Sequence, residues 1–121
     1  MATVELTAEN FNETVENNDL VLVDFWAGWC GPCKSFAPVY DSTSEKHVDV
    51  VFGKVNTEEQ QMLAAQFQIR SIPTLMIFRE QIIIFSQAGA LPPAALEEII
   101  GKAKELDMNV VREEIAKQQQ A

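Results

Sequence analysis

Two kinds of hydrophobic pattern alternate along the chain. Short, nearly continuous apolar runs rich in β-branched residues predict strands, and residues 20–26 are typical of a central strand covered on both faces. Apolar residues three or four positions apart predict helices, as Phe11 and Val15 do after a helix cap at Thr7. The runs predict strands at residues 3–6, 20–26, 48–56, 74–78 and 82–87. The spaced positions predict helices at residues 7–17, 34–45, 58–67 and 92–106.

The order of these elements, β-α-β-α-β-α-β-β-α, predicts an α/β domain. Strands separated by helices need parallel crossovers, while the last two strands are close enough to form an antiparallel hairpin. We therefore expect a mixed central β-sheet flanked by helices on both faces. The domain is expected to cover residues 1–106. For the remaining residues, 107–121, the pattern leaves open a short amphipathic helix or a frayed tail.

The charge and hydropathy of the chain exclude several kinds of function. Nine basic and eighteen acidic residues in 121 give a net charge of −9, so there is no basic excess with which to bind a nucleic-acid backbone. No apolar run approaches the roughly 20 residues needed to span a bilayer. Residues 1–11 have neither a basic start nor an apolar core, so we expect no signal peptide and a cytoplasmic protein.

The only two cysteines, Cys30 and Cys33, are separated by Gly31 and Pro32. This spacing puts Cys33 in the first turn of a helix and Cys30 at its N-terminal edge, where unpaired N–H groups and the helix dipole favour a thiolate. A thiolate is the species that attacks disulfides, and Pro32 suits the start of a helix. Two alternatives are a zinc site, for which one cysteine pair and His47 supply too few ligands, and a chemically inert pair.

Asp24 is out of place in the apolar run 20–26. Alternation puts it on the same face of the strand as Leu22 and Trp26. A carboxylate among apolar neighbours is costly to ionise, so we expect a raised pKa suited to proton transfer. The alternative is a polar residue that is simply satisfied at the end of the strand.

Three segments, in the same order, resemble the signatures of the thioredoxin family. Residues 23–34, Val-Asp-Phe-Trp-Ala-Gly-Trp-Cys-Gly-Pro-Cys-Lys, resemble its active-site segment. Residues 69–75, Ile-Arg-Ser-Ile-Pro-Thr-Leu, resemble its second signature, and Gly89-Ala90 its third. The resemblance implies the thioredoxin fold, which agrees with the α/β pattern, and a thiol-disulfide oxidoreductase working through a redox-active Cys30–Cys33 disulfide.

The resemblance also implies a role for individual residues. Cys30 is the expected nucleophile, Cys33 the resolving thiol and Asp24 the acceptor of the proton of Cys33. Lys54 occupies the position of a lysine that tunes the buried carboxylate, although a solvated strand end is the alternative. The residues expected to contact clients are Trp29, Ile72, Pro73 in a cis peptide bond, Gly89 and Ala90. Trp26 is expected to pack under the active-site loop.

A general protein-disulfide reductase is the function that the resemblance implies. Its electrons would come from NADPH through thioredoxin reductase, a flavoprotein, and it would bind no cofactor or metal itself. We expect a monomer with diverse disulfide-containing client proteins, no nucleic acid and no membrane. The alternatives are a disulfide oxidase or isomerase, and an interaction module whose thiols are incidental.

The chain departs from the family at several positions. Glu80 and Gln81 stand where many members have Asn-Gly, so the turn type is open, and Gln68 stands where glycine is common. Residues 82–85 are unusually apolar for an edge strand, which indicates a buried contact, a dimer edge or an aggregation liability. His47 is expected to be a surface residue without a partner.

Overall fold

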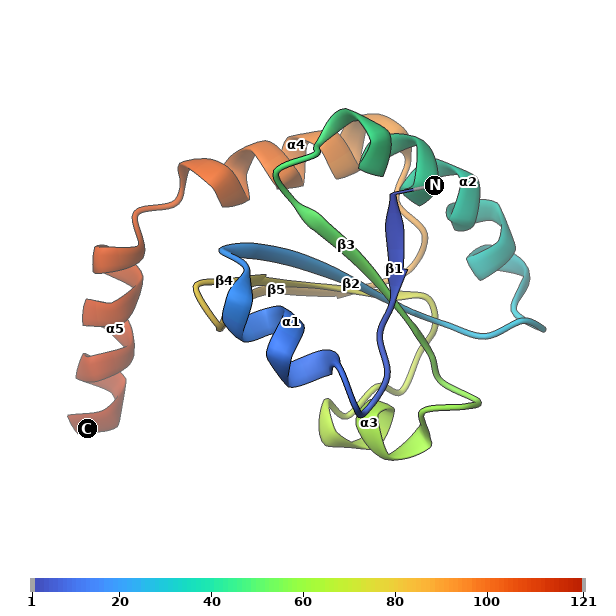
Figure 1. Cartoon of the computed structure of the whole chain (residues 1–121). Coiled ribbons are helices and arrows are strands. Elements are labelled where there is room, and N and C mark those ends of the chain that lie inside the picture. The colour runs from blue at the N-terminus through green and yellow to red at the C-terminus, as the bar shows by residue number, and fades with distance from the viewer. Residues whose placement is uncertain (1, 121) are drawn as a thin grey trace.

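A computed structural model describes residues 2–120 and shows a mixed sheet between two layers of helices (Figure 1). This confirms the predicted fold class. Met1, the first residue of the predicted domain 1–106, lies outside the described residues, and so does Ala121, the last residue of the predicted extension 107–121. The strands are β1 (Thr3–Glu5), β2 (Leu20–Trp26), β3 (Val51–Asn56), β4 (Thr74–Arg79) and β5 (Ile82–Ala88). The helices are α1 (Phe11–Asn17), α2 (Gly31–Lys46), α3 (Gln61–Gln66), α4 (Pro93–Glu105) and α5 (Met108–Gln120).

The five strands lie in the order β1-β3-β2-β4-β5, with β2 in the middle. β3 is parallel to β1 and β2, whereas β4 is antiparallel to β2 and forms the expected hairpin with β5. Each face of the sheet has its own apolar core. Helices α2 and α4 cover one face through residues such as Phe36, Tyr40 and Leu96, while α1 and α3 cover the other through Phe11 and Leu63.

Three local predictions were wrong because they extended an element too far. The first helix begins at Phe11 rather than at Thr7, since Thr7 and Asn10 form a turn in which the Asn10 Oδ1 accepts the Thr7 N–H at 2.7 Å. The third strand begins at Val51, and Val48 before it is 93% exposed. The third helix begins at Gln61 rather than at residue 58; Leu63 and Ala64 are its buried residues, whereas Met62 is 87% exposed.

The turn between β4 and β5 has a left-handed backbone at both central residues. Glu80 and Gln81 have φ angles of 51° and 71°, the arrangement that a two-residue hairpin turn needs to match the twist of its strands. Gln68 likewise has a φ of 55°, which explains why glycine suits that position. The hairpin is closed despite the departure from Asn-Gly.

The apolar segment 82–85 is part of the edge strand β5. Ile84 and Phe85 pack against the core on the α4 side, and with Ile99 and Leu106 they line an apolar pocket of about 310 Å³. Ile83 is 46% exposed. Contact with α4 therefore accounts for much of the apolar character of this edge.

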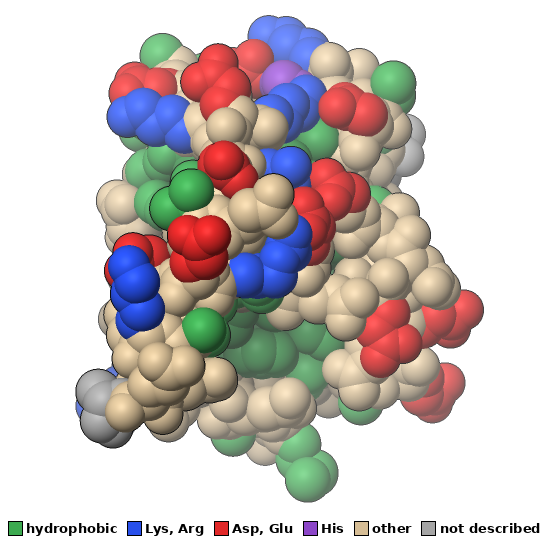
Figure 2. Space-filling view, turned by 90° about the vertical axis from the view of Figure 1, so that its left-hand side faces the viewer, with side chains coloured by type: hydrophobic (Ala, Val, Ile, Leu, Met, Phe, Trp, Pro, Cys, Tyr) green, Lys and Arg blue, Asp and Glu red, His purple; other side chains and the backbone are tan. Residues whose placement is uncertain are grey.

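The chain after α4 forms a second helix, α5, which turns away from α4 along the side of the molecule (Figure 1). Met108 at its start is 4% exposed, and Arg112 forms an ion pair with Glu80 of the hairpin turn. Figure 2 shows this side of the molecule, where acidic and basic side chains intermingle above a hollow lined by hydrophobic ones. Among the described residues, no helix has the length and apolar character that a membrane span requires.

Candidate active site

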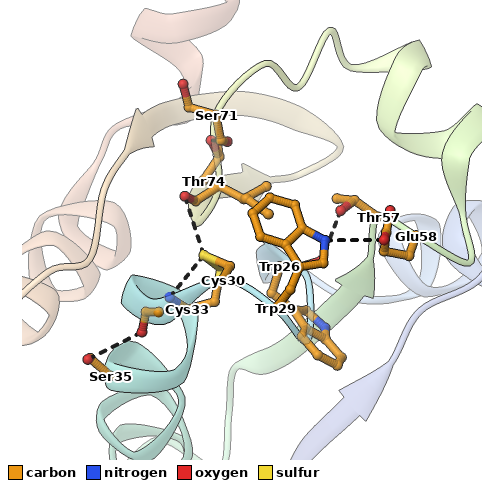
Figure 3. Close-up of a disulfide and its surroundings, with 11 residues drawn as sticks. Trp26, Trp29, Cys30, Cys33, Ser35, Thr57, Glu58, Ser71 and Thr74 are labelled. Atoms are coloured by element: carbon orange, nitrogen blue, oxygen red, sulfur yellow. Dashed lines mark hydrogen bonds between the residues drawn. A yellow bond between two sulfur atoms is a disulfide. The ribbon is translucent and has the colours of Figure 1, made fainter.

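The two cysteines lie where β2 leads into α2 and form a disulfide (Figure 3). Cys30 is the N-cap of α2, and its Sγ accepts the Cys33 backbone N–H at 3.2 Å. Gly31 and Pro32 form the start of the helix between them. The sulfur of Cys30 therefore lies at the positive end of the helix dipole, which favours a thiolate when the disulfide is reduced. The predicted position of the pair at a helix start is confirmed.

The disulfide lies beside a cis peptide bond that links Ile72 to Pro73. The carbonyl oxygen of Ile72 is 3.7 Å from the Cys30 Sγ. On the other side of this bond, the Pro73 carbonyl accepts the backbone N–H of Gly89 at 2.8 Å. Gly89 has a φ of 105°, a conformation that favours glycine, and Ala90 after it is exposed. The fold thus brings the second and third signature segments together next to the first.

Trp29 forms an exposed aromatic surface just before Cys30. Its side chain is 70% exposed, and its indole N–H donates to Glu58 Oε1 at 3.1 Å (Figure 3). Glu58 was not singled out from the sequence, because it lies in the turn after β3 and nothing in its local pattern links it to the cysteines. The hydrogen bond restrains the position of this exposed aromatic ring.

Asp24 lies inside the protein on β2, with only 1% of its surface exposed. Burial raises the pKa of its carboxyl from 3.8 to about 7, opposed by the positive charge of Lys54 and assisted by the negative charge of Asp41. Its Oδ1 has no hydrogen-bond partner among the described residues. The expectation of a raised pKa is confirmed. A carboxyl that titrates near pH 7 can both accept and release a proton under ordinary conditions.

Lys54 is the positive side chain whose charge lowers the pKa of Asp24. The two residues are direct neighbours in the register of β2 and β3. The Lys54 Nζ also lies 5.1 Å from the centre of the Trp26 ring, a cation–π contact. Both Lys54 and Trp26 are half-buried. This contact orients the lysine beside the strand that carries Asp24.

The interpretation of His47 as an isolated surface residue was wrong. Its Nε2 lies 2.6 Å from Glu97 Oε1, its Nδ1 lies 3.0 Å from Lys104 Nζ, and the ring stacks on Phe52. The side chain is 17% exposed. Its partners come from α4, some 50 residues away, so no local pattern indicates them. His47 caps the C-terminal end of α2, opposite the disulfide.

Among the described residues, no three His, Cys, Asp or Glu side chains form a group that could hold a metal ion.

Comparison with known proteins matches residues 2–102 to the model of the thioredoxin family. The chain is 60% identical over 118 residues to a Streptomyces coelicolor protein named "Putative thioredoxin 2", covering 98% of this chain and 88% of that protein. It is 44% identical to a thioredoxin of Porphyra purpurea, covering 84% of this chain and 97% of the relative. A mutant thioredoxin from Halobacterium salinarum has a similar structure, with a TM-score of 0.79 and 31% identity over 87% of this chain and 93% of its own.

Proposed function

The chain belongs to the thioredoxin family of thiol-disulfide oxidoreductases, and on that basis we propose that it is a general protein-disulfide reductase. Its redox group is the internal Cys30–Cys33 disulfide, and no bound cofactor takes part. The observation that supports the proposal most is the position of Cys30. It caps α2, which favours its thiolate, and its Sγ lies 3.7 Å from the carbonyl oxygen of Ile72 in the segment expected to contact clients.

In the first step, the Cys30 thiolate attacks one sulfur of a client disulfide. A bond forms between Cys30 and that sulfur, the client disulfide breaks, and the other client sulfur leaves as a thiolate that takes up a proton. The Cys33 thiolate then attacks the Cys30 Sγ. The Cys30–Cys33 bond forms, the mixed disulfide breaks, and the client's second sulfur leaves as a thiolate. Two electrons have passed to the client.

Asp24 supports the second step by accepting the proton of the Cys33 thiol. Its pKa of about 7 matches this task, because a carboxylate with an ordinary pKa would be a much weaker base. Lys54 tunes Asp24 through its positive charge, which opposes the effect of burial on the pKa of Asp24. Asp24 takes up this proton directly or through a water molecule, and it must lose the proton again before another cycle.

Clients bind through an extended segment that pairs with the backbone of Ile72. Recognition of main chain rather than side chains permits many clients. Trp29 supplies an exposed aromatic surface on one side, while Pro73, Gly89 and Ala90 form the other. Electrons return from NADPH through thioredoxin reductase, and the protein acts in the cytoplasm as a monomer.

The reduction potential of the Cys30–Cys33 pair tests this function. The protein is equilibrated with dithiol buffers of known potential, and the fluorescence of Trp29, which lies next to Cys30, reports the redox state. A value near −270 mV or lower supports a reductase. A value of about −180 mV or higher contradicts it and favours the oxidase or isomerase alternative, whose disulfide is more easily reduced.

Single cysteine variants test the order of attack. Cys33→Ser should accumulate a mixed disulfide between Cys30 and a client, because the resolving thiol is missing. Cys30→Ser should accumulate none. The double variant Cys30→Ser/Cys33→Ser should lose all disulfide reduction. Biological activity that survives in the double variant would favour the interaction module.

A further inference from the structure

Arg70 differs from the other two arginines because its charge is not paired. Arg79 and Arg112 each form ion pairs with acidic side chains. Arg70 is exposed and makes no hydrogen bond or ion pair within residues 2–120. It lines a pocket of about 210 Å³, together with polar residues that include Ser71, Ser86 and Gln87. This pocket lies where the loop before β4 meets the outer strand β5.

The backbone that carries Arg70 is held in place on both sides. The N–H of Ile69 donates to the Ala64 carbonyl at 3.0 Å, and the Ile69 side chain packs against the core on the α1 side of the sheet. After Arg70, the Thr74 hydroxyl donates to the Ser71 carbonyl at 2.6 Å. The guanidinium group is therefore presented from a fixed position rather than from a loose loop.

This position is close to the place where a client would bind. Arg70 is two residues before Ile72, whose carbonyl lies 3.7 Å from the Cys30 Sγ. Two residues of chain span at most about 7 Å, so the backbone of Arg70 lies within that distance of Ile72. A client that pairs with Ile72 and continues toward Ser71 would bring its next side chains to this pocket.

We propose that the pocket beside Arg70 binds an acidic side chain of the client, two to four residues from the client's cysteine and on one side of it. This inference rests on the proposed function, since it concerns the clients of the same disulfide. Guanidinium groups pair with carboxylates through two parallel hydrogen bonds, and the polar neighbours can satisfy the remaining carboxylate lone pairs. The net charge of −9 opposes such clients only weakly, because charges farther than about 8 Å are screened at physiological salt.

The test uses peptide pairs joined by a disulfide, in which one Glu is placed at each position from four before to four after the cysteine. Matched peptides carry Gln or Lys at the same position. For the wild type, kcat/KM should be roughly two- to fivefold higher with Glu than with Gln at one or two positions on one side, and lowest with Lys. The preference should shrink toward one as ionic strength rises, because the pair is exposed.

Four variants test whether the preference for Glu depends on Arg70. Arg70→Gln should bring the Glu/Gln ratio close to one, and Arg70→Lys should keep part of it, since lysine retains the charge but not the two-pronged geometry. Lys46→Gln removes the same charge at the far end of α2, so its ratio should equal that of the wild type. Lys34→Gln removes an exposed charge next to Cys33 and should also leave the ratio unchanged.

Two outcomes would overturn the inference while leaving the proposed function intact. One is equal reduction of Glu, Gln and Lys peptides by the wild type. The other is a Glu preference that disappears in Lys34→Gln but persists in Arg70→Gln. If the wild type reduces none of the peptides, the proposed function itself fails. Failure of the proposed function can therefore be told apart from failure of the inference about Arg70.

Discussion

Asp24 on β2 and Lys54 on β3 are direct neighbours in a parallel register, so a buried acid and a half-buried base share one face of the sheet. Burial raises the pKa of Asp24 more than Lys54 lowers it, and the result is a pKa of about 7. A group at this pKa exists in both protonation states near neutral pH. The protonation of Asp24 therefore affects both the chemistry of the site and the stability of the fold.

Replacement of Asp24 by Asn should stabilise the oxidised protein at alkaline pH. The folded pKa of about 7 lies above the unfolded value of 3.8, so the folded state binds the proton more tightly. The contribution of Asp24 to the stability of the wild type is therefore greatest below about pH 4, and it is lost as the pH rises toward 7. A pKa difference of about 3 corresponds to roughly 4 kcal/mol. Denaturant titrations should show a gain of up to about 4 kcal/mol for Asp24→Asn at pH 8.5.

The gain should vanish below about pH 3, where Asp24 is neutral in both the folded and the unfolded state. Glu105→Gln, an exposed carboxyl of α4, should show no comparable pH dependence. The cost of Asp24→Asn should appear in kinetics instead, as slower release of the client from the mixed disulfide. Release that stays as fast as in the wild type from pH 6 to 9 would remove Asp24 from the proton transfer.

Arg79 connects three parts of the fold and should be important for stability. Its guanidinium donates to the Ala103 and Leu106 carbonyls at 2.6 and 3.2 Å and pairs with Asp19 at 3.1 Å. These bonds satisfy carbonyls at the end of α4 that the helix itself leaves unpaired. Arg79→Met should lower the free energy of unfolding by about 1–3 kcal/mol, measured by denaturant titration.

Lys102→Met is the control for Arg79→Met. The Lys102 side chain is 75% exposed, and within residues 2–120 its one ion pair is with Glu98, so its replacement should change stability by less than about 0.5 kcal/mol. If the two variants lose equal stability, the bonds from Arg79 to the end of α4 contribute nothing measurable.

Gln81→Gly should stabilise the hairpin between β4 and β5. Gln81 has a φ of 71°, where a side chain is strained and glycine is not. The expected gain is up to about 1 kcal/mol, seen as a higher midpoint of thermal unfolding. Gln87→Gly, an exposed position in the extended strand β5, should instead destabilise by about 0.5–1 kcal/mol. A loss of stability in both variants would show that the turn does not gain from glycine.

Removal of residues 107–121 should leave disulfide reduction within twofold of the full chain. Helix α5 contacts the hairpin turn through Arg112 and Glu80, and the Glu80 N–H bonds the Asp19 carbonyl just before β2 begins. The cysteines follow the other end of β2, roughly 20 Å away for a seven-residue strand. Stability should fall by about 1.5–3 kcal/mol, because buried Met108 is lost. A much larger loss of activity would indicate that α5 contributes to catalysis or client binding.

Local sequence was enough to predict the elements and the reacting pair. The apolar run of β2, the alternation of strands with helices and the Cys-Gly-Pro-Cys segment at a helix start each depend on neighbouring residues. The unusual Asp24 was visible for the same reason, since its apolar neighbours adjoin it in the chain. Errors arose at element ends, as at Thr7 and Val48, where short polar segments form turns as readily as helices or strands.

Only the tertiary structure decided which distant groups meet. The partner of Trp29 is Glu58, that of His47 is Glu97, and the Gly89 N–H bonds the Pro73 carbonyl. Each of these contacts joins residues from separate elements, so no periodicity along the chain encodes it. The left-handed turn at residues 80–81 is similar: local preference disfavours it, and the pairing of β4 with β5 imposes it. By itself, the sequence determined which residues can react and where strands and helices form, because both depend on local chemistry, whereas packing decided their partners and environment.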